Sequence, residues 1–392
     1  MIRPLDGYVV NPQAADRVVA PVAESLSDAE RDRILATNPD TSLFLLTQDA
    51  EARSQARVYL DRVTNDGTFR PTTGWWIYRI REGDHQQTGI VAEVAVAAYE
   101  SGLIKRHEHT VAEVAGHLAD TLEEVGGSTH PVSLIYRHDA AIDAIVAGVT
   151  ATEPSLRLSR QGRVQETWQL EDDHGLAAAL DAIPNLYIAD GHHRSAGAAV
   201  LSHRPAPGLA GLRSHFLAAL FPDTAMKTLS YHRCLHLPDH SPAEVLAAIA
   251  RHFPVKPLPE PGGVPEAGEA WLYADGTWYT LRLPKGTEEG PTTALDAARL
   301  QHQILGPICD VADPRADPRL NYVPGNVPLP VLAGECREQA GLAFVTHPPS
   351  VDDVIAVSDA GGIMPPKSTW FTPKMGAGIF LRRLDRTGPS GD

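Results

Sequence analysis

The chain has 392 residues, a formal net charge of −15 at pH 7 and a sequence pI near 5.5. Hydrophobic residues make up 43% and charged residues 21%, an ordinary globular composition that excludes wholesale disorder. The acidic balance argues against a protein that coats DNA or RNA, because such a protein needs a basic face to displace counterions. At roughly 150 residues per domain, this length predicts two or three domains or one large, elaborated domain.

The sequence predicts a soluble, cytoplasmic protein without a membrane partner. Its start lacks an apolar run after the positive charge, and no stretch reaches the roughly 18 apolar residues that span a bilayer. The cysteines Cys234, Cys309 and Cys336 are far apart, odd in number and without metal-ligand spacing. We therefore expect buried or neutral thiols and no disulfide framework.

The first predicted helix follows Ser27, whose spacing to Glu30 forms a capping box, and it ends at Asn38-Pro39. Apolar periodicity and β-forming residues then predict a helix over 50–63, a hairpin of strands 75–80 and 88–95, a helix over 111–125 and a buried strand over 132–136. The pattern continues with exposed strands within 160–175, a helix over 175–183, a buried strand over 185–189, a helix beginning near 195, strands over 215–221 and 228–237, and a helix over 242–252.

A Pro/Gly-rich stretch over 254–268 is the best linker or long loop, and a clear hairpin joins strands 271–273 and 278–281. Mixed elements without regular βαβ spacing predict an α+β, or irregular α/β, fold. We divide the chain into three predicted regions, 1–135, 136–250 and 251–384. They are followed by a tail, 385–392, that we expect to be disordered. Neither the dinucleotide-binding glycine fingerprint nor the P-loop is present.

The most informative stretch is the predicted strand-to-helix turn at Asp190, Gly191, His192, His193 and Arg194. Glycine permits a tight turn, and a helix start presents free N–H groups that bind anions. Arginine adds a cationic fork suited to phosphate, the histidines add donors, and the aspartate could hold Mg²⁺ or orient a hydroxyl group. The alternative is that the aspartate only caps the helix while the histidines pack or face solvent. A zinc site is the weaker interpretation, because adjacent histidines point apart.

A second cluster lies just before the helix over 111–125. It contains Arg106, His107 and Glu108, and the carboxylate could act as a general base for a hydroxyl group. The alternative is a solvated charged loop.

A third cluster is a Pro-stiffened stretch over 364–374, in which Lys367, Ser368 and Lys374 offer charges and donors to phosphate. Its aromatic pair Trp370-Phe371 could stack on a base, although core packing is commoner. A fourth, Tyr231-His232-Arg233, by itself indicates a strand with a partnered arginine.

Taken in order, these stretches resemble a bacterial and archaeal family known as domain of unknown function 1015, over nearly the whole chain. The resemblance is carried by Ile2-Arg3-Pro4, Asn38-Pro39, Thr88-Gly89-Ile90, 104–110, 189–194, 231–233 and 364–374. It implies a nucleotide site like that of the ParB/sulfiredoxin superfamily, with elaborations.

The resemblance also implies a kinase that uses ATP or ADP with Mg²⁺ to phosphorylate a small hydroxy amino acid, free L-serine being the leading acceptor. In this interpretation Asp190 binds Mg²⁺ or orients the hydroxyl group, and Glu108, with His107 nearby, is the base. Phosphates are held by Gly191, His192, His193, Arg194, Lys367, Ser368 and Lys374, and the acceptor by Arg106, His232 and Arg233. A homodimer is left open as the assembly.

The chain departs from the family pattern at two places. The family's Pro-Pro-Tyr-Asp near the start is replaced by Ala20-Pro21-Val22-Ala23-Glu24, and the Lys and Asp-Arg pair usual after the His-Glu motif are missing from 111–117. If those groups touch the acceptor or a phosphate, this protein has changed its substrate or lost the activity. A nucleotide-binding sensor and a divergent enzyme acting on another hydroxyl compound are therefore alternatives, and a metal-dependent hydrolase is a weaker one.

Overall fold

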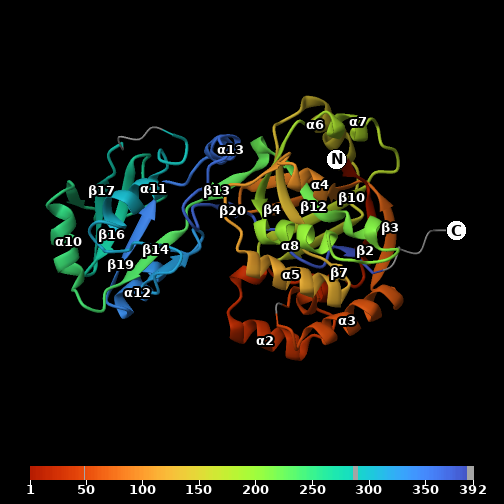
Figure 1. Ribbon diagram of the computed structural model, residues 1–392, viewed down its shortest axis with the longest axis horizontal. Coiled ribbons are helices and arrows are strands. Elements are labelled where there is room, and N and C mark those ends of the chain that lie inside the picture. Colours follow the sequence, from red (N-terminus) through yellow and green to blue (C-terminus); the bar gives the residue numbers. More distant parts are fainter. Residues whose placement is uncertain (48, 286–289, 386–392) are drawn as a thin grey trace. The chain divides into compact units, whose positions relative to one another are not determined.

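The computed structural model describes residues 1–47, 49–285 and 290–385 and divides the chain into two compact units (Figure 1). Unit 1 contains Met1–Met226 and Pro373–Asp392, and unit 2 contains Lys227–Thr372. The chain thus leaves unit 1 and later returns to it. These limits do not coincide with the boundaries at 135/136 and 250/251 delineated from the sequence. Residues 386–392 of the tail expected to be disordered lie outside the described residues.

Unit 1 mixes helices and sheets, as expected. Its strands are β1 (Ile2–Arg3), β2 (Leu5–Val10), β3 (Phe69–Gly74), β4 (Trp76–Glu82), β5 (His85–Ala95), β6 (Ile104–Lys105), β7 (Gly127–Ser128), β8 (Val132–Tyr136), β9 (Leu156–Arg160), β10 (Arg163–Gln169), β11 (Leu186–Asp190), β12 (His215–Pro222) and β21 (Phe380–Arg383). Its helices are α1 (Ala15–Val18), α2 (Asp28–Thr37), α3 (Arg53–Asn65), α4 (Val96–Glu100), α5 (Ala112–Val125), α6 (Ala140–Thr150), α7 (Leu176–Asp181), α8 (His192–Ser202) and α9 (Ala210–Arg213), with short 3-10 turns η1 (Ala23–Ser25), η2 (Ser42–Leu46) and η3 (Asp223–Ala225).

A large mixed sheet forms the centre of unit 1, in the order β6-β11-β8-β12-β5-β4-β10-β9, with β1 paired to β5. A smaller sheet has the order β3-β2-β21-β7, so the returning chain contributes β21 to it. The predicted capping box forms in full at α2, where Ser27 and Glu30 bond reciprocally. The hairpin of β4 and β5 also forms, with Glu82 opposite His85.

The strands within 160–175 differ from the expectation of exposed strands. Strand β10 ends at Gln169, and its Glu166 is only 1% exposed. The carboxylate is buried because it pairs with Arg157 at 2.6 Å and Arg81 at 3.0 Å, which lie on neighbouring strands β9 and β4. A polar, alternating strand can thus be buried when opposite charges meet across a sheet.

Helix α8 packs closely on α5, and this contact positions the start of α8. The buried face of α8 consists largely of small residues, including Ala196, Gly197 and Ala198. A Cβ atom at Gly197 would lie only 2.8 Å from Cβ of Leu118. Glycine at this position therefore allows the two helices to approach.

Unit 2 consists of strands β13 (Lys227–Leu229), β14 (His232–His236), β15 (Val255–Pro257), β16 (Glu269–Ala274), β17 (Thr277–Arg282), β18 (Leu320–Val323), β19 (Gly341–Thr346) and β20 (Trp370–Thr372), and of helices α10 (Pro242–Ala250), α11 (Asp296–Leu300), α12 (Leu329–Glu338) and α13 (Val351–Asp359), with a π-helical turn η4 (Gln301–Leu305). Its main sheet has the order β15-β17-β16-β19-β14-β18, and β13 pairs with β20. The stretch 254–268 is a loop within this unit that includes β15.

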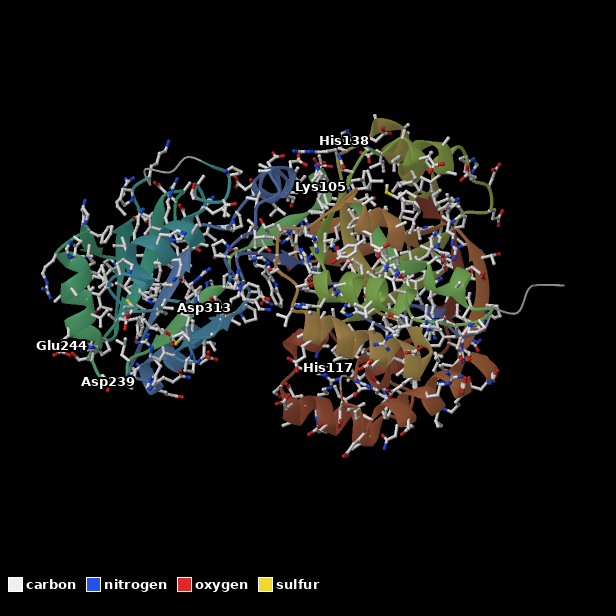
Figure 2. All side chains as sticks on the ribbon, viewed as in Figure 1. Lys105, His117, His138, Asp239, Glu244 and Asp313 are labelled. Atoms are coloured by element: carbon white, nitrogen blue, oxygen red, sulfur yellow. A yellow bond between two sulfur atoms is a disulfide. The ribbon has the colours of Figure 1, made fainter. Side chains whose placement is uncertain are left out.

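Apolar side chains along the strands of unit 2 point alternately to the two faces of its main sheet, so this unit has a hydrophobic cluster on each face. Leu272 and Phe344 pack with residues of α10 and α11, whereas Trp271 and Val345 pack with residues of α12. Helix α10 begins with a capping box in which Glu244, labelled in Figure 2, bonds back to Ser241.

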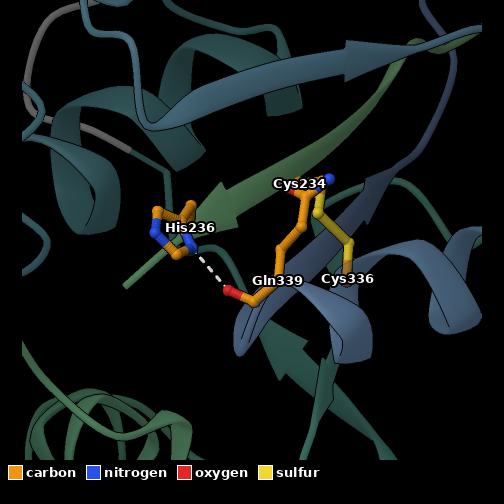
Figure 3. Close-up of a disulfide and its surroundings, with 4 residues drawn as sticks. All are labelled: Cys234, His236, Cys336 and Gln339. Atoms are coloured by element: carbon orange, nitrogen blue, oxygen red, sulfur yellow. Dashed lines mark hydrogen bonds between the residues drawn. A yellow bond between two sulfur atoms is a disulfide. The ribbon is translucent and has the colours of Figure 1, made fainter. Parts of the chain in front are cut away.

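A disulfide joins Cys234 of β14 to Cys336 of α12, with the Cα atoms 5.8 Å apart (Figure 3). The expectation that all three cysteines are thiols was wrong, because the fold brings together two residues that lie 102 positions apart. Cys309 remains a free, buried cysteine, and burial raises the pKa of its thiol to about 12.

Candidate functional site

The turn between β11 and α8 is built as its sequence predicts. Strand β11 is buried up to Asp190, and Gly191 follows in the left-handed conformation, with φ of 100°. The positive φ favours glycine here, and a Cβ atom at Gly191 would lie 2.8 Å from Nε of Arg194, so a larger residue would displace the Arg194 guanidinium. Helix α8 begins at His192, three residues earlier than predicted, so the whole His-His-Arg run lies in its first turn.

Asp190 is held between two cations at this turn. Its Oδ2 accepts a hydrogen bond from Nη2 of Arg194, and its Oδ1 accepts one from Nζ of Lys374. Burial alone would raise the pKa of Asp190, but Lys374 and Arg194 outweigh it and hold the pKa well below its usual range. The carboxylate is therefore ionised at neutral pH. Its single negative charge faces the positive charges of Arg194 and Lys374, so the three side chains together carry a net charge of +1.

Two side-chain nitrogen atoms at this turn have no hydrogen-bond partner within the described part of the chain. Nη1 of Arg194 is buried without a hydrogen-bond partner there, and so is Nε2 of His192. Helix α8 adds the positive end of its dipole and the N–H groups of its first turn. Surplus cationic charge, unused donors and a close backbone approach together suit an anion such as a phosphate group.

His107 and His192 form a buried pair beside this turn. Their rings meet edge to face, with centroids 4.5 Å apart, and both side chains are less than 5% exposed. Burial lowers the pKa of each to about 3, so both are neutral at pH 7. Nδ1 of His192 lies 3.5 Å from Oε2 of Glu108, whose side chain is about one-third exposed. The carboxylate predicted as a base is thus next to the predicted phosphate turn.

His193 and Arg106 make other contacts. Nε2 of His193 accepts a hydrogen bond of 3.2 Å from the N–H of Val111, which ties the start of α5 to α8. Arg106 is exposed, and its Nη1 donates to the hydroxyl group of Tyr99 at 3.3 Å. Nζ of the neighbouring Lys105, which is labelled in Figure 2, lies 5.9 Å from the centre of the Tyr187 ring.

The 364–374 stretch is divided between the units, and only its last two residues, including Lys374, belong to unit 1. In unit 2, Lys367 is exposed with Nζ 5.3 Å from the Tyr231 ring centre. Oγ of Ser368 donates to the carbonyl of Pro365 at 2.8 Å. Trp370 and Phe371 are buried in β20, as the core-packing alternative predicts.

His232 and Arg233 lie on β14 of unit 2, and both are buried. Nη1 of Arg233 donates to the carbonyl of Tyr231 at 3.1 Å, and its guanidinium lies over the Tyr322 ring. The expectation of a strand with a partnered arginine is therefore confirmed.

His130 is a site residue that the sequence did not reveal. It lies just before β8, and Arg194, Asp190 and Lys374 all act on its charge. Burial, reinforced by the two cations, lowers the pKa of His130 well below its usual value. A single histidine ahead of an apolar strand carries no signal of its own, and only the fold relates it to the turn.

The family model described as protein of unknown function, DUF1015, matches residues 2–298. The chain belongs to this family. No curated protein matches the chain.

Solved structures with similar folds include a free serine kinase in complex with AMP, at 12% identity and a TM-score of 0.41, covering 75% of this chain and 91% of that one. A C-terminally truncated SbnI from Staphylococcus aureus has 15% identity and a TM-score of 0.41, with coverage of 77% and 90%. A conserved hypothetical protein from Pyrococcus furiosus has 12% identity and a TM-score of 0.37, with coverage of 74% and 95%. At such low scores, these matches by themselves assign no activity to this DUF1015 member.

The described residues of this family member include no group of three or more His, Cys, Asp or Glu side chains that could hold a metal ion. The two oxygens of Asp190 already accept bonds from Arg194 and Lys374, so this carboxylate does not fit a ready-made Mg²⁺ site. For the same reason, the described residues do not form the metal site that a metal-dependent hydrolase would need. Over the same part of the chain, no helix is both long and apolar enough to cross a bilayer.

Proposed function

We propose that this DUF1015 protein is a nucleotide-dependent phosphotransferase acting on the hydroxyl group of a small amino acid, with free L-serine as the leading acceptor. The observation that supports it most is the convergence of Arg194 and Lys374 on Asp190, at the glycine turn that opens α8. Phosphoryl transfer depends chiefly on positioning and charge neutralisation, which such a turn supplies.

The phosphates of ATP or ADP would be held by this turn. Gly191 lets the backbone approach a phosphate closely, and Arg194 offers the buried Nη1 that has no partner within the described chain. His192, neutral at pH 7, lines the turn without adding charge. Asp190 orients Arg194 and Lys374 and keeps the excess positive charge small enough for the empty turn to be stable.

Glu108 is the proposed general base. The acceptor oxygen attacks the terminal phosphorus, the bond from phosphorus to the bridging nucleotide oxygen breaks, and the hydroxyl proton passes to the Glu108 carboxylate. His192, 3.5 Å away, orients this carboxylate, and His107 supports the His192 ring from its edge. His107 is therefore a positioning residue in this proposal.

The other predicted contacts stay predictions. Arg106, exposed and two residues before Glu108, is a candidate for the acceptor carboxylate. Lys367 and Ser368 remain candidates for the nucleotide, and His232 and Arg233 for the acceptor. Mg²⁺, which usually accompanies nucleotide phosphates, is not assigned to Asp190, because both oxygens of that carboxylate are bonded to cations.

A nucleotide-binding sensor is the second candidate. It is favoured by the stretch 111–117, which lacks the Lys and Asp-Arg pair usual in the family and in which the N–H of Val111 is bonded to His193. A sensor would bind nucleotide at the same turn without transferring phosphate. A divergent enzyme acting on another hydroxyl compound would show turnover with a different acceptor.

A turnover screen of the full-length protein tests these candidates. ATP and ADP, each with Mg²⁺, are combined with a panel of hydroxy amino acids that includes L-serine, and phosphorylated acceptor is detected by ³¹P NMR. Acceptor-dependent product that is lost in Arg194→Ala but kept in the exposed control Arg70→Ala would support the kinase. Nucleotide binding without any product would favour the sensor, and the absence of both would refute the phosphate-binding turn.

A further inference from the structure

The loop between β6 and α5 carries Glu108, and few of its side chains are buried. Among residues 106–114, all of which the structure describes, only His107 is buried, and Val111 is 53% exposed. Helix α5 starts directly after Val111, whose apolar side chain forms no cap. The packing and capping of these residues therefore do little to fix the end of the loop.

The segment formed by β11 and α8 holds this loop at both ends. At the first end, β6 pairs with β11 in parallel, and Ile104 lies opposite Leu186. At the second end, Nε2 of His193 accepts a hydrogen bond of 3.2 Å from the N–H of Val111. The first contact is made by the backbone alone, whereas the second depends on the side chain of His193.

The two adjacent histidines of α8 contact different parts of the same loop. Consecutive residues of an α-helix point about 100° apart, so the two rings reach different places. Nδ1 of His192 lies 3.5 Å from Oε2 of Glu108, and Nε2 of His193 meets the backbone three residues further along the chain. His192 thus contacts the carboxylate, whereas His193 holds the backbone that carries it.

The hydrogen bond between His193 and Val111 extends the close contact between α8 and α5. A Cβ atom at Gly197 would lie 3.3 Å from the carbonyl oxygen of Ala115, so the two helices already touch there. His193 and Val111 each lie four residues, about one helical turn, before these two residues. The bond therefore links the start of α5 to the first turn of α8, which is the turn proposed to hold phosphates.

We propose that His193 is a positioning residue for Glu108, which holds the loop over 106–110 so that the base lies beside the phosphate turn. The proposal rests on the phosphotransferase proposed above, and it gives His193 a role other than that of a phosphate ligand. Because Nε2 of His193 accepts from the N–H of Val111, this nitrogen carries no proton that it could donate to a phosphate oxygen.

The test compares His193→Ala with His193→Gln in the full-length protein, by acceptor-dependent turnover and by calorimetric titration with ADP. Alanine removes the acceptor, whereas the side-chain oxygen of glutamine can accept from the same N–H. We expect kcat to fall about tenfold to a hundredfold in His193→Ala, with ADP affinity changed less than about twofold, and to recover in His193→Gln. An unchanged kcat in His193→Ala, or an ADP affinity that falls as much as kcat, would overturn the positioning role.

Hydrogen exchange of the segment 104–115, followed by mass spectrometry, tests the link without any activity. Exchange at the start of α5 should become about fivefold faster in His193→Ala, as the loss of one hydrogen bond implies. It should stay at the parent rate in His193→Gln and in the control His203→Ala, whose side chain at the end of α8 is 72% exposed. Unchanged exchange in His193→Ala would overturn the link even in an active kinase. Faster exchange in a protein without turnover on any acceptor would leave the link standing and refute the phosphotransferase.

Discussion

Nζ of Lys374 donates a hydrogen bond to Oδ1 of Asp190 across 184 residues of sequence. The contact exists because the chain returns to unit 1 at Pro373. It places a second cation next to Arg194 at the start of α8, and the proposed phosphate site depends on this pair of cations.

Replacing Lys374 with methionine keeps much of the side-chain bulk but removes the charge. We expect nucleotide affinity to fall about tenfold to a hundredfold, in line with one lost charge-assisted contact to phosphate. Calorimetric titration with ADP measures the change. Lys256→Met, at an exposed lysine of β15, serves as the control and should bind like the parent protein; equal weakening in both variants would refute the role of Lys374.

Gly191 and Gly175 provide a matched pair of left-handed residues, each preceding a helix, with φ of 100° and 83°. Alanine at either position costs about 1–2 kcal/mol of backbone strain. Only at Gly191 does the added Cβ also meet the Arg194 side chain, at 2.8 Å, whereas Gly175 has nothing within 4 Å. Gly191→Ala should therefore lose both stability and nucleotide binding, and Gly175→Ala only stability. Retained binding in Gly191→Ala would show that Arg194 does not need its present position.

The buried histidine pair makes unit 1 sensitive to acid. In the fold the pKa of His107 and of His192 is about 3, whereas an unfolded histidine takes up its proton near pH 6.5. Between these values the unfolded chain binds more protons, so stability falls as the pH falls, by up to about 1.4 kcal/mol per pH unit for each histidine.

Urea unfolding at several pH values between 7 and 4 measures this slope. His192→Gln should make it shallower, and His109→Gln, at an exposed histidine, should not. An unchanged slope in His192→Gln would mean that this imidazole is not held neutral.

Glu108→Gln separates chemistry from binding. Because the amide cannot accept the hydroxyl proton, kcat should fall at least about a hundredfold while nucleotide affinity changes little. The exposed Glu113, at the start of α5, gives the control Glu113→Gln. A normal kcat in Glu108→Gln would remove this carboxylate from the role of base.

Thiol counting distinguishes the disulfide from three free cysteines. Protein unfolded in denaturant without reductant should show one reactive thiol, that of Cys309, and three after reduction. Three thiols before reduction would contradict the Cys234–Cys336 bond. Breaking that bond by Cys336→Ser should lower the free energy of unfolding of unit 2 by about 2–4 kcal/mol.

The parts of the fold that the sequence predicted are those set by local patterns. The capping box at Ser27, the hairpin of β4 and β5 and the turn at Gly191 depend on residues close in sequence, and each forms. The start of α8 was placed too late, because the alanine-rich run after Ser195 is a stronger helix signal than the two histidines before it.

Contacts between residues that lie far apart in the sequence could not be predicted from local patterns. The pairing of Lys374 with Asp190, the place of His130 and the disulfide all depend on how the chain returns upon itself. The buried Glu166 was also misjudged, since its burial depends on arginines from neighbouring strands.

The most direct test of the account is calorimetric titration of the full-length protein and of Arg194→Ala with ADP. The account predicts saturable binding to the parent protein, unchanged in Arg70→Ala and weakened at least about tenfold in Arg194→Ala. Binding of equal strength in all three proteins would contradict the claim that the turn between β11 and α8 holds the nucleotide phosphates.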